Sequence, residues 1–470
     1  MNTTRKERWD APSWVLDAVF YQIFPDRFAN GDPENDPPNT VPWDSKPTPD
    51  NFFGGDLKGI QDHLNHLSTL GVNAIYLTPI FRAGTNHRYD TWDYFTIDPT
   101  LGTTETFQTL VNAVHQKGMR IILDAVFNHC GEGFWAFEDV KKCGASSRYA
   151  NWFILMGNSI VTEPPNYQTC GGAFYLPKLN TRNSEVQDYL FNVATYWSRE
   201  SQIDGWRLDV PWKIPIRFWR EFRRLMKSLN PDLYILGEVW RNIEPWLKGD
   251  TFDGVMNYPL RSYILDYFIN CAMDAEDFNY EIMLQQHTIG KAAYYLINLL
   301  GSHDTPRIAT LCHNDIQLMR PILVFLFTYI GAPMIYYGDE IGLQGGNDPE
   351  CRGGMEWNKT KWNLPLLKLY QELIALRHQH PALRRGSYEP LLVFNSVYAY
   401  RRCFEQDEII VILNPRPLSY SNVKVPLKAY AHKNKLWMDT LSHGTFSTTK
   451  GVLNFELLPA YATYVLIPIL

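Results

Sequence analysis

The chain has few cysteines, and none of them are closely paired. Its 470 residues include 7 cysteines, an odd number, and no two stand in a CxxC arrangement. Zinc-binding domains and disulfide scaffolds usually show such spacing. The scattered cysteines therefore predict reduced thiols and a cytoplasmic protein.

An uninterrupted apolar run of membrane-spanning length is also missing. The longest apolar stretch, PILVFLFTYIGAPMIYY, is interrupted by Gly331 and Pro333, which predicts a buried helix followed by a strand. The opening MNTTRKERWDAPSW has basic side chains but no apolar segment behind them. We therefore expect neither a membrane span nor a secretory signal in the chain as given.

The chain also has no strong excess of either charge. The 50 acidic and 44 basic residues give a net charge of −6, and neither sign forms a long run. Nucleic acid and anionic membrane surfaces are therefore poor candidates for the main partner. The aromatic fraction of 14% favours a ligand with flat apolar faces, such as a sugar, although aromatic side chains also fill protein cores.

The sequence does contain a regular alternation of strand-like and helix-like segments. Eight short apolar runs read as strands: VFYQIFP, AIYLTPI, RIILDAVF, GWRLDV, LYILGEV, GVMNY, YLINLLGSH and MIYYGDE. After Asn183, which with Ser184 is a candidate N-cap, apolar residues recur at helical spacing from Val186 to Trp197. This order predicts an α/β fold, a (β/α)8 TIM barrel.

Two segments depart from this alternation and predict further parts. Residues 129–182 are irregular, with GEGF, TEPPN and CGG, which predicts a small inserted subdomain over the pocket. The barrel would then comprise residues 1–128 and 183–385. From about Gly386 the texture becomes short β-rich runs, so residues 386–470 predict a C-terminal antiparallel β-sandwich domain.

Three acidic residues stand at or near the ends of predicted strands. Asp209 lies in GWRLDV, Glu238 follows YILG, and Asp304 follows LINLLGSH. Because strand ends converge at one face of a barrel, these carboxylates can share one pocket. Convergent carboxylates suit chemistry at an acetal, where one attacks and another transfers a proton. A single such acid could be an ordinary loop acid or helix cap, but three together favour the chemical interpretation.

Four motifs in order resemble the alpha-amylase family of retaining glycoside hydrolases, family 13. They are DAVFNH (124–129), GWRLD (205–209), GEVW (237–240) and LLGSHD (299–304), each at a strand end. The resemblance covers nearly the whole chain. It implies that Asp209 is the nucleophile, Glu238 the general acid/base, and Asp304 the stabiliser of the distorted transition state.

The residue types agree with these roles. A retaining mechanism needs a nucleophile and a proton donor about 5 Å apart. Arg207 is two residues before Asp209 in a strand, so both point to one face. We expect this guanidinium to lower the pKa of Asp209, and the neighbouring anions to raise the pKa of Glu238. Arg207 could also be a purely structural ion-pair partner.

The resemblance implies further sugar-binding residues. His129 and His303 stand beside motif ends and could hydrogen-bond hydroxyls of the cleaved sugar, although a lone histidine is more often structural. Tyr89, in NHRYDTWDY, corresponds to the residue that stacks under that sugar. Asp348 and Arg352, in DPECRGGMEW, resemble a pair that grips the next sugar toward the non-reducing end, but acid–base pairs also close loops.

The sequence LPKLN (176–180) is close to the MPKLN signature of the neopullulanase, cyclomaltodextrinase and maltogenic amylase subgroup. Two further segments, ANGDPENDP and FFGGD, have the spacing that forms a structural calcium site in members of this subgroup. The corresponding oxygen ligands here are those of Asn30, Asp32, Asn35, Asp36, Gly54 and Asp56. Hard oxygen ligands in this number suit Ca²⁺. The alternative is an Asx-rich turn capped by its own side chains.

The chain also departs from the subgroup pattern. Strand one begins near Ala18, which leaves no room for the N-terminal β-sandwich domain that helps to build dimers there. We therefore leave open a monomer or a homodimer. Three and four positions after the nucleophile the subgroup often has an Asn-Glu pair, whereas this chain has Trp212 and Lys213. These positions resemble those on the leaving-group side, so we expect the exchange to change the balance between hydrolysis and transfer and between α-1,4 and α-1,6 bonds.

Together these features predict a retaining hydrolase of α-1,4-glucosidic bonds in malto-oligosaccharides, cyclodextrins or pullulan. Structural Ca²⁺ and no organic cofactor are expected. An α-1,6 debranching or transglycosylating enzyme with the same acids is the first alternative. A non-catalytic α-glucan-binding protein is the second, although such relatives normally lose catalytic acids.

Overall fold

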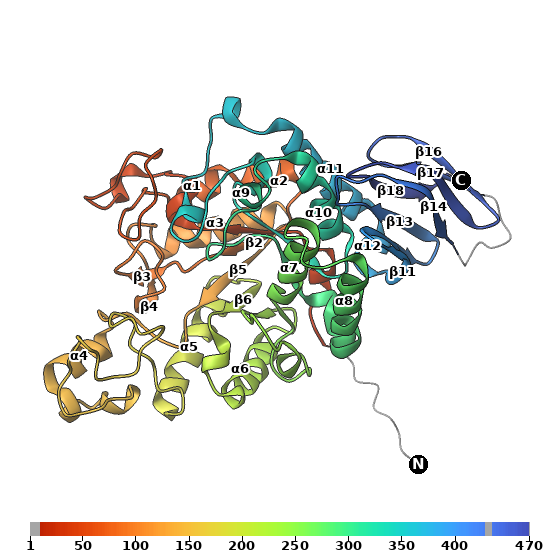
Figure 1. The fold of residues 1–470 in the computed structure, drawn as a ribbon. Helices are drawn as coiled ribbons and strands as arrows, with labels where there is room; N and C mark the ends of the chain where they lie inside the picture. The colour runs from red at the N-terminus through yellow and green to blue at the C-terminus, as the bar shows by residue number, and fades with distance from the viewer. Residues whose placement is uncertain (1–9, 428–434, 470) are drawn as a thin grey trace, which may run out of the picture.

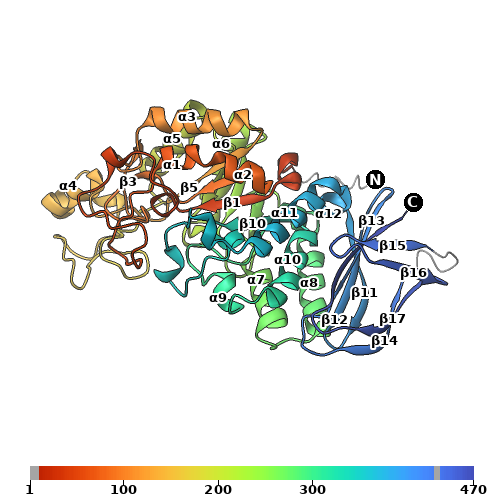
Figure 2. The ribbon, with the colours of Figure 1, turned by 90° about the horizontal axis from the view of Figure 1, so that it is seen from above.

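The structure is a computed structural model that describes residues 10–427 and 435–469. It consists of a barrel, an irregular segment at one edge of it and a β domain at the opposite side (Figure 1). The view from above shows the same separation, with the blue β domain far from the segment around α4 (Figure 2). The expectation about a leader concerns residues 1–14, of which residues 1–9 lie outside the described part.

Eight parallel strands form the barrel, in the order β8-β7-β6-β5-β2-β1-β10-β9. They are β1 Phe20–Ile23, β2 Ala74–Leu77, β5 Arg120–Ala125, β6 Gly205–Leu208, β7 Tyr234–Gly237, β8 Gly254–Val255, β9 Ile297–Leu299 and β10 Ala332–Tyr336. A parallel bridge between Met256 and Ile297 closes the ring. Every strand coincides with one of the eight predicted runs, so the predicted barrel is confirmed.

The barrel interior is filled by side chains and forms a core of its own. Inward-facing residues include Phe20, Tyr76, Ile122, Tyr234 and Met334, all fully or nearly fully buried. A second, larger core lies between the outer faces of the strands and the surrounding helices. Strands buried on both faces explain why the predicted runs are continuously apolar instead of alternating.

The helices follow the strands, as the alternation predicts. They are α1 Leu57–Asp62, α2 Leu64–Leu70, α3 Thr104–Gln116, α4 Trp135–Cys143, α5 Ser184–Glu200, α6 Ile216–Leu229, α7 Tyr258–Ile264, α8 Ala275–Ile289, α9 Ile308–Leu311, α10 Ile316–Thr328, α11 Leu364–Gln379 and α12 Pro381–Arg385. The Asn183 side chain accepts a hydrogen bond from the Glu185 N–H and caps α5, whose predicted apolar face is buried. No helix among the described residues has the length and apolarity that a membrane crossing requires.

The segment between β5 and α5 contains α4, short 3-10 turns and isolated bridges but no extended sheet. One bridge pairs Lys178 with His129, so the LPKLN motif lies directly beside the end of β5. A separate antiparallel hairpin, β3 Phe81–Ala83 and β4 Thr91–Ile97, follows β2. Both segments follow the carboxyl end of a barrel strand, so they surround the face of the barrel where the strands end.

The C-terminal domain is antiparallel, with the order β11-β12-β13-β18-β15-β16-β17-β14. Its strands are β11 Ser387–Phe394, β12 Val397–Phe404, β13 Asp407–Leu413, β14 Tyr420–Pro426, β15 Leu436–Asp439, β16 Thr445–Thr449, β17 Val452–Leu458 and β18 Thr463–Pro468. On β12, Val397 and Ala399 face the core of this domain, whereas Tyr398 and Tyr400 pack with the barrel helices. Because successive side chains of a strand point to opposite faces, β12 contributes to the core of its own domain and to the contact with the barrel.

Candidate active site

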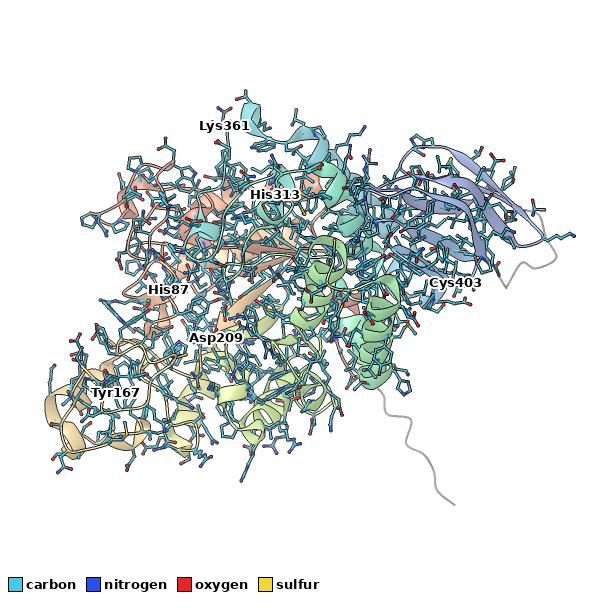
Figure 3. All side chains as sticks on the ribbon, viewed as in Figure 1. His87, Tyr167, Asp209, His313, Lys361 and Cys403 are labelled. Atoms are coloured by element: carbon cyan, nitrogen blue, oxygen red, sulfur yellow. The ribbon has the colours of Figure 1, made fainter. Side chains whose placement is uncertain are left out.

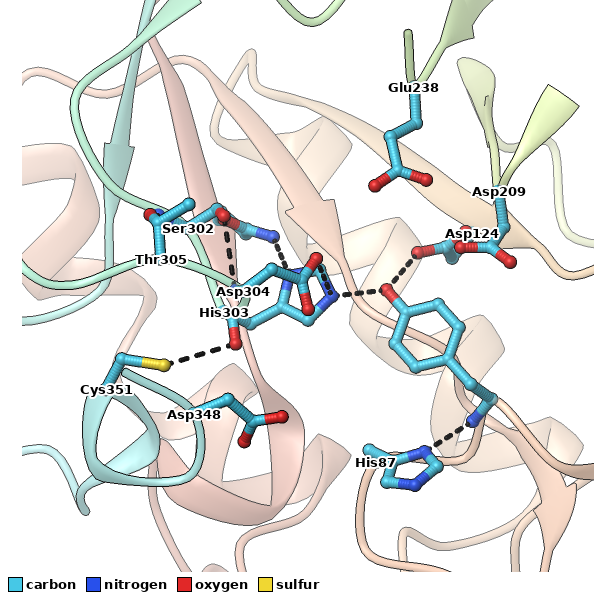
Figure 4. A network of polar contacts seen from close by, with 12 residues as sticks. His87, Asp124, Asp209, Glu238, Ser302, His303, Asp304, Thr305, Asp348 and Cys351 are labelled. Atoms are coloured by element: carbon cyan, nitrogen blue, oxygen red, sulfur yellow. Dashed lines mark hydrogen bonds and ion pairs between the residues drawn. The ribbon is translucent and has the colours of Figure 1, made fainter. Parts of the chain in front are cut away.

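The three predicted acids lie close together at the end of the barrel where the strands terminate (Figure 4). Asp209 directly follows β6, Glu238 directly follows β7, and Asp304 lies a few residues beyond β9. Figure 3 places Asp209 near the middle of the molecule, on the side that faces the segment with Tyr167 and away from Cys403 of the C-terminal domain. The topology of the barrel therefore brings these distant residues into one pocket, as the sequence predicts.

Arg207, the third residue of β6, connects the acids. Its guanidinium is fully buried, and Nη1 donates to both carboxylate oxygens of Asp124 and to Oδ1 of Asp209, each at 2.9 Å. Nη2 lies 3.0 Å from Glu238 Oε1, although this contact does not have the geometry of a hydrogen bond. One cation therefore orients three carboxyl groups at once.

The two oxygens of Asp209 differ. Oδ1 is held by Arg207, whereas Oδ2 is buried and has no hydrogen-bond partner within the described residues. Glu238 is held differently: the Trp240 indole N–H donates to Oε1 and the Val210 N–H donates to Oε2, both at 3.0 Å. Asp209 therefore keeps one oxygen without a hydrogen bond among the described residues, whereas both oxygens of Glu238 accept one.

Val210, which follows Asp209, has a left-handed backbone with a φ of 42°. This conformation is strained for a β-branched side chain. It turns the chain so that the Val210 N–H reaches Glu238, which joins the segments after β6 and β7. The strained residue therefore lies between the two acids and helps to orient Glu238.

Burial makes the largest contribution to the pKa shifts of Asp209 and Glu238. It raises the pKa of Asp209 well above its ordinary value, and the charge of Glu238 adds to the rise, whereas Arg207 opposes it. Burial also raises the pKa of Glu238 against the effect of Arg207, with a further contribution from Asp304. Arg207 does lower the pKa of Asp209, as predicted, but the larger effect of burial makes the net shift upward.

Asp304 is the most accessible of the three acids, with 32% of its side chain exposed. Arg352 Nη2 donates to its Oδ1 at 3.2 Å, and Arg352 Nη1 lies 3.1 Å from Asp348 Oδ1. The predicted Asp348–Arg352 pair therefore exists and continues directly to Asp304. The three residues form one wall of the pocket.

Tyr89, His303 and His129 lie around the same centre, and His303 Nε2 is 3.2 Å from Asp304 Oδ2. The Tyr89 hydroxyl lies 2.8 Å from Asp124 Oδ2 and 2.7 Å from His303 Nε2, and the two rings are nearly parallel. Burial lowers the pKa of His129 to about 4 and the pKa of His303 well below its ordinary value. Both imidazoles are therefore neutral near neutral pH, and His129 Nε2 has no partner within the described part of the chain.

Trp212 and Lys213 lie beyond Asp209 in a 3-10 turn, Pro211–Lys213. Both side chains are exposed, and they line a groove of about 640 Å³ that also includes Lys178 of the LPKLN motif. Cys170 lies nearby, and burial followed by the charge of Asp209 raises the pKa of its thiol to about 11. All seven cysteines are free thiols, as the sequence predicts.

The predicted calcium ligands gather around the N-terminus of α1. Asn30 Nδ2 donates to both oxygens of Asp36, at 2.9 and 3.0 Å, and its buried Oδ1 has no partner in the described structure. Gly54 has a φ of +80°, and a Cβ there would lie 2.3 Å from Asp36 Oδ1. The amide group of Asn30, through its nitrogen, the carboxylate of Asp36 and the Gly54 backbone thus lie close together.

The other three candidates also hold the local backbone. Asp56 caps α1 and accepts hydrogen bonds from the N–H groups of Gly31, Asp32 and Gly59, and from Asn35 Nδ2 at 3.4 Å. Asp32 caps the short turn Pro33–Asn35. Across residues 10–427 and 435–469, no three His, Cys, Asp or Glu side chains are arranged to hold a metal ion. A cation here would therefore depend on amide and carbonyl oxygens as well.

Sequence reasoning missed several residues of the centre. Asp124 stands in the quoted DAVFNH motif but was not predicted as a site residue, although it accepts from Arg207, Tyr76 and Tyr89. Gln22 at the end of β1 lies 2.8 Å from His303 Nδ1. Trp240, the last residue of GEVW, donates to Glu238. A polar residue at or next to the end of a predicted strand was the available signal for Gln22 and Asp124.

The comparisons with known proteins agree with this geometry. The alpha amylase catalytic domain family matches residues 22–363. A cyclomaltodextrinase of Geobacillus thermopakistaniensis is 48% identical over 97% of this chain and 78% of its own length. An intracellular maltogenic amylase of Bacillus subtilis is 46% identical over 87% of this chain and 70% of its own length.

A solved structure of nearly the same extent is the cyclic alpha-maltosyl-(1→6)-maltose hydrolase of Arthrobacter globiformis. It superposes with a TM-score of 0.88 at 45% identity and covers 97% of this chain and 99% of its own. The matched family spans well over half of the residues, including the strands that carry the acids. The chain therefore belongs to the alpha-amylase family of glycoside hydrolases, in the subgroup of cyclomaltodextrinases, neopullulanases and maltogenic amylases.

Proposed function

We propose that the protein is a retaining α-glucan hydrolase in which Asp209 attacks the anomeric carbon and Glu238 transfers the proton. The observation that carries this proposal is the arrangement around Arg207. Asp209 has one oxygen held and one free, and Glu238 touches the same guanidinium. A nucleophile needs a fixed orientation and an unoccupied lone pair, and Asp209 has both.

The reaction proceeds in two displacements. Asp209 Oδ2 bonds to the anomeric carbon as the glycosidic C–O bond breaks, and Glu238 gives its proton to the departing oxygen. Glu238 then takes a proton from water, whose oxygen displaces Asp209 and restores the α configuration. Asp304 lies across the pocket, where its carboxylate stabilises the positive charge that develops on the sugar ring.

The shared environment supports these protonation states. Four buried or partly buried carboxyl groups face two guanidinium groups, those of Arg207 and Arg352. Full ionisation would therefore leave excess negative charge, which favours one retained proton. The proposal assigns the negative charge to Asp209, whose Oδ1 accepts a charge-assisted hydrogen bond from Arg207, and the proton to Glu238, whose pKa burial and the charge of Asp304 raise.

We propose α-1,4 bonds of malto-oligosaccharides, cyclodextrins or pullulan as the substrates. The names of the related cyclomaltodextrinase and maltogenic amylase support this choice. Proton NMR of the first product tests the mechanism: the α anomer is expected, and an initial β anomer would refute a retaining reaction. On pullulan, panose is expected from α-1,4 cleavage, whereas longer chains would indicate transfer.

Cleavage of substrates with α-1,6 bonds is the second candidate. It is favoured by the Arthrobacter globiformis relative, which has nearly the same extent as this chain and whose substrate is a cyclic pair of maltose units joined 1→6. Maltotriose as the main product from pullulan would support this candidate over the first. A complete lack of turnover on cyclodextrin, pullulan and starch would instead support the non-catalytic α-glucan-binding alternative.

We also propose a structural Ca²⁺ at the Asn30–Asp56 cluster. The buried, unpartnered Asn30 Oδ1 next to the Asp36 carboxylate supports it, since hard oxygens suit this ion. Bound there, the ion would tie the segment after β1 to the start of α1. Thermal unfolding with EDTA, then with added Ca²⁺, tests the site: a lowered and restored melting temperature is expected, and an unchanged one would contradict it.

A cytoplasmic location is the remaining proposal. The free thiols support it, as does the name of the intracellular maltogenic amylase from Bacillus subtilis. Fractionation of the native host would place the protein in the soluble cytoplasmic fraction. Light scattering after size-exclusion chromatography would separate the monomer from the homodimer.

A further inference from the structure

A groove on the leaving-group side of the catalytic acids combines positive charge with an exposed aromatic ring. We call it the cationic groove. Its volume is about 640 Å³, and the residues that define it here are Lys178, Arg182, Trp212 and Lys213, above a floor that includes Ile154 and Ile214. No acidic side chain among the described residues lines it. The chain as a whole is acidic, with a net charge of −6, so this local excess of cations is specific to the groove.

None of the three cations is neutralised by a neighbour. Over the described part of the chain, Lys178, Arg182 and Lys213 form no ion pair, and their charged groups donate no hydrogen bond to protein atoms. By contrast, Arg217 and Arg220 on the adjacent helix α6 pair with Glu221 and Asp250.

The three cations also repel one another. Burial lowers the pKa of Lys178, and the charges of Lys213 and Arg182 contribute to that lowering. Lys178 is half-buried, so its charge is less fully solvated than that of an exposed lysine. Placing like charges together without a counter-ion is unfavourable unless a ligand offsets them.

The groove is continuous with the catalytic centre. The Lys178 backbone pairs with that of His129, and Lys213 stands four residues after Asp209. Trp212 is 41% exposed and offers an indole face at the mouth. A sugar bound on the leaving-group side of Glu238 would therefore meet this ring and these cations together.

We infer that the cationic groove binds an anionic α-glucan, specifically a phosphate ester on a glucose unit of the leaving-group side. The inference rests on the proposed function and adds a substrate class to it. Neutral hydroxyl groups can accept hydrogen bonds from lysine but leave the three charges unbalanced. A phosphate group carries close to two negative charges and three acceptor oxygens, which suits two ammonium groups and one guanidinium.

The test compares two substrates on the full chain: maltopentaose, and maltopentaose with a 6-phosphate on a glucose near its reducing end. At low ionic strength we expect kcat/KM to be about tenfold higher for the phosphorylated substrate, which corresponds to about 1.4 kcal/mol. The advantage should shrink at high salt, because the charges are partly exposed. Equal kcat/KM values for the two substrates would overturn the inference, whereas no turnover of neutral maltopentaose would instead refute the proposed hydrolase function.

Variants locate the effect. Arg182→Gln should lower kcat/KM for the phosphorylated substrate by more than it lowers kcat/KM for neutral maltopentaose and so remove most of the preference for phosphate, and Lys178→Gln should reduce the preference. Arg224→Gln is the matched control, since Arg224 is an 80% exposed arginine of α6 outside the groove. A preference that survives in both groove variants would overturn the assignment to this groove. A substrate with a 6-carboxylate that gains as much as the phosphate ester would overturn the choice of phosphate.

Discussion

Two regions of the molecule bury arginine side chains, and they do so with opposite partners. At the catalytic end, Arg207 faces the carboxyl groups of Asp124, Asp209 and Glu238. At the junction with the C-terminal domain, Arg377 donates to the carbonyl oxygens of Phe327, Gly331 and Leu383. Arg402 similarly donates to carbonyl oxygens, among them Gly386 and Thr328.

The partners determine what each charge does. Burial tends to lower the pKa of Arg207, but the charges of Asp124 and Glu238 outweigh it and the pKa rises. Burial lowers the pKa of Arg377 to about 9, and the charge of Arg402 adds to the effect. The catalytic end thus balances charge against charge in a pocket, whereas the junction uses each guanidinium to satisfy backbone carbonyls between elements. The first arrangement serves chemistry and the second serves stability.

The largest expected effect is a loss of activity, without a loss of stability, at the end of the barrel that carries the acids. Asp209→Asn removes the nucleophile, so we expect kcat on maltotriose or cyclodextrin to fall about 10⁴-fold or more. The melting temperature should stay the same or rise, because one buried carboxyl is no longer ionisable. Activity assays and thermal unfolding measure both quantities. Asp232→Asn, an exposed acid of a loop, is the control and should retain full activity; a fully active Asp209→Asn would refute the assignment.

The reverse result is expected at the junction. Arg402→Met leaves the carbonyl oxygens of Ser387, Gly386 and Thr328 without their donor, which should cost about 3 kcal/mol of unfolding free energy. The kcat of the folded protein should remain unchanged. Denaturant titration measures the loss, and Arg320→Met, at an exposed position of α10, should change stability by less than about 0.5 kcal/mol. An equal loss in both variants would contradict the role of Arg402.

The pH dependence of stability sharpens the comparison. Burial holds the folded-state pKa of His129 at about 4, below its ordinary 6.5, so the unfolded chain binds this proton first as the pH falls. Neutral His129 makes its full contribution to the free energy of unfolding above pH 6.5, and this contribution is lost as the pH falls from 6.5 to 4. At pH 5 the loss should be about 2 kcal/mol.

The variant His129→Gln should therefore lose less unfolding free energy than the wild type between pH 7 and pH 5. Denaturant titrations at the two pH values measure this difference. His313→Gln, at an exposed position, serves as the control and should follow the wild type. A wild-type slope in His129→Gln would show that this imidazole is not held neutral by the fold.

The smallest expected effect concerns the rim of the pocket. Asp348 has a 48% exposed side chain and pairs with Arg352, which in turn binds Asp304. Asp348→Ala should raise KM several-fold, up to about tenfold, and leave kcat within about twofold, because Arg352 keeps its contact with Asp304. Steady-state kinetics on maltotriose measure both constants. Glu350→Ala is a neighbouring control, and a large fall in kcat for Asp348→Ala would place Asp348 in the chemistry itself.

Much of this architecture is readable from local sequence. The eight barrel strands coincide with the predicted runs, because a strand buried on both faces must be almost entirely apolar. Asn183 and the face of α5 follow from capping and helical spacing. The convergence of the three acids was predictable because each of them follows an apolar strand, and the parallel strands of a barrel end at one face.

Other features depend on contacts that no local pattern records. Asp124 stands at a strand end like Asp209, but its partners Tyr76, Tyr89 and Arg207 come from three other segments. The direction of the Asp209 pKa shift depends first on how deeply the fold buries this carboxyl group, and then on the charges of Arg207 and Glu238 beside it. Likewise, the cationic groove arises because the LPKLN segment lies against the turn after β6.

Sequence alone determined the fold class, the family motifs and the identity of the acids, since these depend on residue types and their order along strands. The tertiary structure decided which charges share a counter-ion, which oxygen of Asp209 remains free and where cations gather without partners. The physical reason is distance: Coulomb interactions, desolvation and hydrogen-bond geometry depend on separations of a few ångströms, and only the folded chain sets them.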